Sequence, residues 1–290
     1  MTNIDWNGYI DRARAVAVEA EELWTAHAPQ LIDTNDHRRR VTYGLRLALL
    51  VEYHATLILL RDPFVAYAGE ALLRGSLEAW AHLAWIEWGE PKSNRRGKQL
   101  KSKTKTNHCM SDNRRSWSTR ETRALCWCMG DASWFHKNVA AAHASVKERR
   151  VTRQARDRAK RFRGLHMATG CPGVRGRDQG DVQAMLVLIA RKYHLPWAPA
   201  LWRAYSATAH QGTPIRLNRR SPGGSSEGRA ALSTAERRAL LVRNVTVFLN
   251  AYQLVLFLST DSAASWYEFQ TRVAVPATAL NAELNALPLE

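Results

Sequence analysis

Four ionisable side chains recur at every fourth position of an otherwise apolar segment, where they could form either an ion-pair network or a polar site between helices. They are Glu70, Arg74, Glu78 and His82. Residues four apart share one face of an α-helix. Burying such groups is costly unless they pair with one another. We therefore favour a self-satisfied network that fixes helix register, with an inward-facing polar site as the alternative.

A second group of polar side chains lies in the segment WRAYSATAH at residues 202–210. Arg203 and His210 are seven residues apart, which places them about 20° from one line along a helix. Ser206 falls on the same face. A histidine at the C-terminal end of a helix is also stabilised by the helix dipole, so a purely structural role for His210 is one interpretation. A catalytic pair of Arg203 and His210, with Ser206 beside them, is the other.

This segment resembles the signature of the HEPN superfamily, in which an arginine and a histidine are separated by four to six residues. Members are small all-α dimeric domains of prokaryotic toxins and defence systems. The run RGSLE at 74–78 and the run HQGT at 210–213 also resemble uncharacterised bacterial helical proteins placed near that superfamily. The resemblance covers residues 37–90 and 181–260.

The HEPN resemblance implies a homodimeric, metal-independent endoribonuclease of a bacterial toxin or defence system. His210 would then be the acid/base for attack of an RNA 2′-hydroxyl on the adjacent phosphate. Arg203 would hold the negative charge that develops on the phosphate. Ala204 follows Arg203 at a position where active members usually have a polar residue. The alternative is a non-catalytic nucleic-acid-binding or scaffold protein with a structural polar core.

The cysteines and remaining histidines do not follow the spacing of a metal site. Cys126 and Cys128 form a CxC pair rather than CxxC, and Cys109 and Cys171 are isolated. Structural zinc sites use regularly spaced cysteine and histidine ligands. We therefore expect buried thiols, no metal and no cofactor. The chain also contains no P-loop, GxGxxG, HExxH or GxSxG motif.

The positive charge of the chain is concentrated in one quarter of its length. The whole protein has 42 Lys and Arg residues against 26 Asp and Glu residues, a net charge of +16. Residues 92–163 alone contain 21 of these basic residues and only five acidic ones, so the rest of the chain is neutral overall. We interpret residues 92–163 as a basic insertion into a neutral helical body. Such a charge excess favours a polyanionic partner, RNA more than DNA.

The insertion combines a polar loop at 92–117 with helices at about 118–163. Within it, five cations step by four, three, four and three residues and so share one face of a helix. These are Arg149, Arg153, Arg156, Lys160 and Arg163, while Val151, Ala155, Ala159 and Phe162 fall on the opposite face. We expect this cationic ridge, together with Arg114 and Arg115 of the loop, to bind the phosphate backbone. A solvated face or an anionic lipid surface are the alternatives.

The rest of the chain shows helical periodicity and no alternating strand pattern. Asp62 followed by Pro63 predicts the start of a helix that runs to Trp88, and capping boxes begin at Ser118 and Ser233. The expected helices span residues 4–31, 38–60, 62–88, 181–193, 199–210 and 234–258. Trp80, Trp85 and Trp88 are expected in the core. Trp117, Trp127 and Trp134 could pack there or stack on unpaired bases.

Length and composition agree with a globular all-α protein. The chain has 290 residues, of which 46% are hydrophobic and 23% charged, so a mostly disordered chain is excluded. Its two most apolar runs, at 45–60 and 245–258, are interrupted by polar residues, so no membrane span is expected. We therefore expect one helical domain over residues 1–290, a HEPN-like bundle carrying the basic insertion, in the cytoplasm.

Overall fold

A computed structural model confirms the all-α class. The structure describes residues 4–28, 37–88, 120, 123–125, 127–128, 132, 153–162, 164, 182–209, 232–260 and 263–288. Within these ranges the regular elements are helices, and none of these residues belongs to a strand. The predicted loop at 92–117 and the capping box at Ser118 lie outside the described residues.

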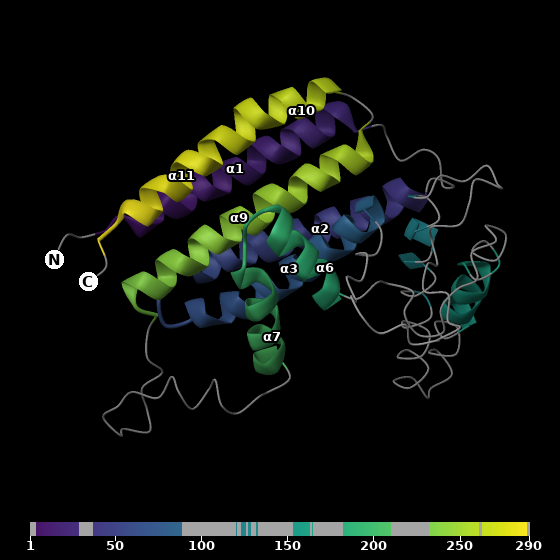
Figure 1. Cartoon of the computed structure of the whole chain (residues 1–290), viewed down its shortest axis with the longest axis horizontal. Coiled ribbons are helices and arrows are strands. Elements are labelled where there is room, and N and C mark those ends of the chain that lie inside the picture. The colour runs from purple at the N-terminus through teal and green to yellow at the C-terminus, as the bar shows by residue number, and fades with distance from the viewer. Residues whose placement is uncertain are drawn as a thin grey trace, which may run out of the picture.

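The helical body consists of long antiparallel helices with two shorter ones packed against α3. The elements in chain order are α1 (Trp6–His27), α2 (His37–Leu59), the 3₁₀ turn η1 (Ala66–Ala68), α3 (Gly69–Trp88), α6 (Val182–Lys192), α7 (Trp197–Ala209), α9 (Thr234–Ser259), α10 (Ala263–Phe269), the π-helical turn η2 (Gln270–Ala274) and α11 (Val275–Ala286). In Figure 1, α1 lies beside α10 and α11, α9 occupies the middle, and α2 and α3 form the next layer. The helices α6 and α7 pack on α3 and on each other.

The central helix α9 provides much of the core. Phe248 and Tyr252 are buried on it, and the Phe248 ring stacks on Tyr53 of α2 with 4.2 Å between ring centroids. Among the described helices, α9 is the one long and apolar enough to cross a membrane, and 61% of its apolar stretch is buried inside the bundle. Its position between other helices explains its composition as that of a core helix. The capping box predicted at Ser233 is present, with Ser233 and Glu236 each accepting the other's backbone N–H.

Buried arginines tie the helices together. The guanidinium of Arg46 on α2 is paired with Glu21 on α1, and the same carboxylate accepts the hydroxyl of Tyr252 on α9. Arg46 also lies 3.7 Å from the ring centroid of Trp24. Burial and the neighbouring Glu21 carboxylate raise the pKa of Tyr252, so its hydroxyl stays a neutral donor. Removing either member of this pair would be strongly destabilising, because it would leave the other charge buried without a partner.

The connection between α2 and α3 differs from the sequence prediction. Asp62 does not begin α3; its carboxylate accepts the N–H of Phe64, and its carbonyl accepts the N–H of Ala66. This Asx-type turn leads into η1, and the α-helix begins only at Gly69. The predicted start was wrong by about two turns, because an aspartate before a proline suits a tight turn as well as a helix cap.

The C-terminal helical segment, residues 263–286, is an element that the sequence analysis did not predict. It is nearly continuous but contains the π-helical turn η2, where the N–H of Val275 donates to the carbonyl of Gln270. Pro276 follows and has no N–H to offer the carbonyl of Arg272, which favours the wider turn. Its buried residues are Ser265, Phe269, Val273, Ala277, Leu280 and Leu284.

The basic insertion is anchored to the body at its described residues. Arg123 is buried, and its guanidinium donates to the carbonyls of Ile86 and Glu87 at 2.6 and 2.8 Å. These carbonyls end α3, so Arg123 acts as a cap for that helix. Ala124, Leu125, Cys128 and Ala132 are also buried. The insertion therefore contributes to the core as well as to the charge.

Candidate functional site

Arg74 and Glu78, two members of the predicted line of ionisable groups on α3, form an ion pair in the structure. The Nε and Nη2 atoms of Arg74 lie 3.0 and 2.9 Å from Oε1 of Glu78. The side chains are 22% and 33% exposed, so the pair is only partly buried. The same oxygen accepts the indole N–H of Trp202 from α7 at 3.0 Å. The pair therefore connects α3 to α7.

The other two members of the line lie on either side of this pair along α3. Glu70 is half-buried in the first turn of the helix. His82 is half-buried, and its ring makes a T-shaped contact with Trp127, with 6.1 Å between centroids. Trp127 belongs to the insertion and packs against the core, as its core interpretation predicted. The four residues follow one slowly drifting line along α3, and the hydrogen bond between Arg74 and Glu78 lies in the middle of that line.

Glu52 on α2 is the acid that the sequence analysis missed. Its carboxylate lies directly against the Cα of Gly75, where a larger residue would collide with it. Its Oε2 atom is buried and has no hydrogen-bond partner among the described residues. Burial raises the pKa of Glu52 to about 7, the nearby Glu78 carboxylate adds to the rise, and the Ser76 hydroxyl opposes it. A lone acid in the apolar run 45–60 was the signal available in the sequence.

The α7 segment presents Arg203 to solvent. Its Nε donates weakly to the carbonyl of Pro199 at 3.4 Å, and no acidic partner is found for it in the described part of the chain. The hydroxyl of Ser206 donates to the carbonyl of Trp202 at 2.7 Å, one turn earlier. This is the ordinary bond of a serine within a helix. His210 lies outside the described residues, so the predicted catalytic pair stays a prediction.

The helix at residues 153–162 has the two faces that its sequence predicted. Ala155, Ala159 and Phe162 are buried, and the Phe162 ring makes a T-shaped contact with His37 at the start of α2. Its cations Arg153, Arg156 and Lys160 are exposed. None of these three forms an ion pair with a residue that the structure describes. These three are the described members of the cationic ridge; its other two residues, Arg149 and Arg163, and the loop residues Arg114 and Arg115 lie outside the described residues.

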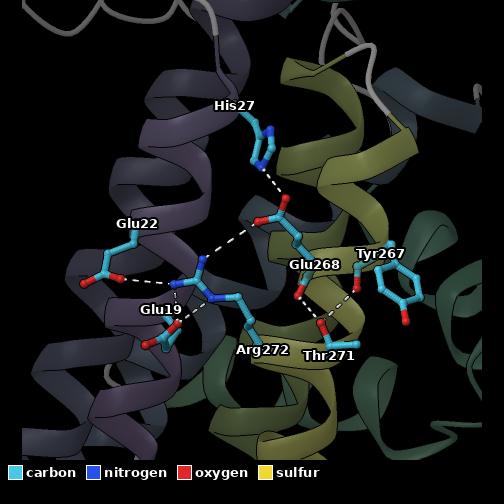
Figure 2. Close-up of polar contacts among 7 residues, drawn as sticks. All are labelled: Glu19, Glu22, His27, Tyr267, Glu268, Thr271 and Arg272. Atoms are coloured by element: carbon cyan, nitrogen blue, oxygen red, sulfur yellow. Dashed lines mark hydrogen bonds and ion pairs between the residues drawn. The ribbon is translucent and has the colours of Figure 1, made fainter.

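An ion network that includes three acidic side chains joins α1 to the C-terminal helix (Figure 2). Arg272 of η2 lies 2.7 Å from Glu19 and 3.2 Å from Glu22, and it also approaches Glu268. His27 lies 3.2 Å from Glu268 on the other side. Arg272 lies at the centre of the group and pairs with its three carboxylates. In the part of the chain that the structure describes, no group of three or more His, Cys, Asp or Glu side chains could hold a metal ion.

Comparisons with protein-family models, with curated proteins and with solved structures found no match for this chain. The resemblance to the HEPN superfamily therefore stays a prediction from the quoted motifs.

Proposed function

We propose that the protein binds RNA, with the cationic ridge as its contact to the phosphate backbone. The observation that carries the proposal is the exposure of Arg153, Arg156 and Lys160 on a helix whose opposite face is anchored in the core. Three like charges within about 10 Å of helix repel one another. A polyanion removes this repulsion and releases counterions when it binds.

The anchoring of the ridge supports binding over mere solubility. Phe162 fixes the helix against His37, so the three cations are held on a packed element rather than on a free tail. A fixed array of cations loses less conformational entropy on binding than a mobile one. The thin apolar face of the helix is already buried in the protein, which leaves little to insert into a lipid surface.

Charge reversal tests this proposal. The double variant Arg153→Glu with Arg156→Glu should weaken binding of a single-stranded RNA at least tenfold. The slope of log K against log salt should fall by about 1.4, since each lost phosphate contact on a single strand contributes about 0.7. The control is Arg14→Glu with Arg61→Glu, which makes the same charge change on α1 and beyond the end of α2; because Arg61 pairs with Asp11, thermal unfolding checks that this variant is folded. An unchanged slope in the ridge variant would refute the assignment.

A second candidate function is metal-independent cleavage of RNA by a HEPN-like homodimer. The observation that favours it is the exposed Arg203, whose guanidinium has no acidic partner among the described residues and is open to a phosphate. In this function Arg203 would hold the phosphate and His210 would transfer the proton. Cleavage of labelled RNA in EDTA, leaving cyclic phosphate ends and lost in His210→Ala, would support it. Binding without cleavage would favour the non-catalytic alternative.

A further inference from the structure

A cleft of about 790 Å³ lies where α3, α6 and α9 end and α10 begins. This volume is within the range of small-molecule sites. Its walls include four aromatic side chains, three from different helices and one from the turn after α6, namely Trp88, Phe257, Trp266 and Tyr193. Phe257 and Trp266 are 49% and 42% exposed, although both are large apolar residues. Large exposed aromatics that converge on one cleft indicate a surface for a planar ligand.

Two cations line the same cleft. The ammonium of Lys192 lies 3.9 Å from the ring centroid of Trp88, and the guanidinium of Arg120 lies 5.1 Å from that of Phe257. Arg120 also pairs with Glu87 at 2.5 Å. Because the protein's own cations already occupy two aromatic faces, the cleft is poorly suited to a cationic ligand. Two cations against one acid favour a ligand that is both planar and anionic.

Local backbone features hold these side chains in place. His194 adopts a positive φ of 54°, and the N–H of Leu195 donates to the carbonyl of Ala190 at 2.9 Å. This is the Schellman pattern that ends a helix, and a histidine in this conformation is strained relative to glycine. It fixes Lys192 and Tyr193 at the end of α6. Arg120 is set by the insertion, whose Arg123 caps α3 beside Glu87.

The polar groups of the cleft can recognise the edge of a base. Gln253 lines it from α9 with an amide that both donates and accepts hydrogen bonds. Thr260 and Ser265 also line it, but their buried hydroxyls are hydrogen-bonded to each other at 2.8 Å and to the carbonyl of Leu256, so Gln253 is the side chain left to read a base. The Oε2 atom of Glu87 is buried and has no hydrogen-bond partner among the described residues. An acceptor left in this state is suited to a donor from a ligand, such as an exocyclic amine or a ribose hydroxyl.

We propose that this cleft binds one nucleotide, with the base stacked on the exposed ring of Trp266 and the phosphate near Lys192 and Arg120. The nucleotide belongs either to a bound single-stranded RNA or to a free nucleotide; only in the first case does this inference rest on the proposed function. The cleft lies where α3 ends, and Figure 1 shows α2 beginning at the same end of the bundle. The cationic-ridge helix packs at the same end, on His37 of α2. An RNA strand on the ridge is thus brought toward the cleft.

The test measures affinity for two probes, adenosine monophosphate and a single-stranded RNA decamer that carries one 2-aminopurine. Trp266→Ala removes one stacking face and should lower the affinity for the probe that binds in the cleft at least fivefold. If that probe is the RNA, quenching of 2-aminopurine fluorescence should also be lost. Its matched control is Tyr267→Ala, because Tyr267 is the next residue on the same helix, is 72% exposed and does not line the cleft. Lys192→Ala, with Arg191→Ala as its control, examines the phosphate contact.

Each outcome decides between the sources or against the site. If the affinity for adenosine monophosphate falls in Trp266→Ala and in Lys192→Ala, the cleft binds a free nucleotide. This conclusion holds even if charge reversal of the ridge leaves RNA binding unchanged. If only the RNA decamer shows that dependence, the cleft holds a base of a bound strand. If both probes bind Trp266→Ala and Lys192→Ala as tightly as the wild type, or if neither probe binds the wild type, the inference is wrong. Thermal unfolding checks that each variant is folded.

Discussion

Glu52 shows how one buried carboxylate makes stability depend on pH. Its ordinary pKa of 4.5 rises to about 7 in the folded protein, chiefly through burial against Gly75. The folded state therefore keeps a proton that the unfolded state releases between these values. The stability from this group is fully present below about pH 4.5 and is lost as the pH rises through about 7.

The first prediction is that Glu52→Gln stabilises the protein at high pH. Glutamine has nearly the same shape but cannot ionise, so it avoids the cost of a buried charge. At pH 8 the free energy of unfolding should increase by up to about 3 kcal/mol, while at pH 5 it should change by less than about 1 kcal/mol. Urea denaturation at the two pH values measures this. An equal change at both would show that ionisation of Glu52 is not the cause.

The second prediction concerns the ion pair of Arg74 and Glu78. Arg74→Ala should cost about 1 kcal/mol, because Glu78 is partly solvated and keeps the indole donor of Trp202. Combining it with Trp202→Phe should cost more than the sum of the single changes, since Glu78 then loses both donors. A double-mutant cycle by chemical denaturation measures the coupling. A loss above 3 kcal/mol for Arg74→Ala alone would mean that the pair behaves as fully buried.

Among the elements, two helices are ended by arginines that come from distant parts of the chain. Arg237 of α9 donates to the carbonyls of Leu60 and Arg61 beyond α2, and Arg123 does the same for α3. Helix ends leave carbonyls without partners, and a cation there also suits the helix dipole. The forked guanidinium can bond two carbonyls at once. The fold therefore uses part of its excess arginine as internal caps.

The third prediction is that Arg237→Lys keeps the charge but loses most of the cap. An ammonium cannot reproduce the two parallel bonds, so the free energy of unfolding should fall by about 1–2 kcal/mol. Arg191→Lys, at an exposed position of α6, is the control and should change stability by less than about 0.5 kcal/mol. Thermal unfolding of both variants measures the difference. Equal melting temperatures for Arg237→Lys and Arg191→Lys would contradict the capping role of Arg237.

The elements that the sequence predicted are those with a straight apolar stripe. Helices expected at 38–60, 181–193 and 234–258 occur within two residues of those limits. The segment 263–286 escaped detection because its buried residues 265, 269, 273 and 277 follow one another at intervals of four. In a pure α-helix this spacing drifts by about 40° per step. The wider turn η2 compensates for the drift, and helical periodicity alone does not reveal such a turn.

At the scale of the whole molecule, the predictable part of the candidate site was the part that lies on single helices. Arg74 and Glu78 followed from four-residue spacing, and the ridge followed from alternating steps of three and four. The approach of Trp202 to Glu78 joins residues 124 positions apart, and the cleft joins the ends of separate helices. Such contacts depend on packing, which one sequence does not reveal. Nor could charge counting separate the buried Arg46, Arg123 and Arg237 from the exposed ridge.

The fourth prediction is that RNA contacts map to one end of the bundle. The ridge and the cleft both lie near the start of α2 and the end of α3, whereas the chain termini lie at the opposite end (Figure 1). Crosslinking with an RNA that contains 4-thiouridine, followed by mass spectrometry, should give crosslinks within residues 153–162 and at Trp88 or Trp266. Crosslinks confined to the opposite end, around Tyr9 or Leu287, would contradict both assignments.

The π-helical turn η2 also sets the phase between the two halves of the C-terminal helix. Compared with an α-helix, it holds one additional residue, so α10 is turned by about 100° relative to where a regular helix would place it. That rotation lets Trp266 line the cleft while Ser265 and Phe269 stay buried. An ancestral or engineered chain lacking a single residue between 270 and 274 would keep its helix but lose this phase. The number of residues in this turn, rather than their type, would then distinguish chains that have this cleft from chains that do not.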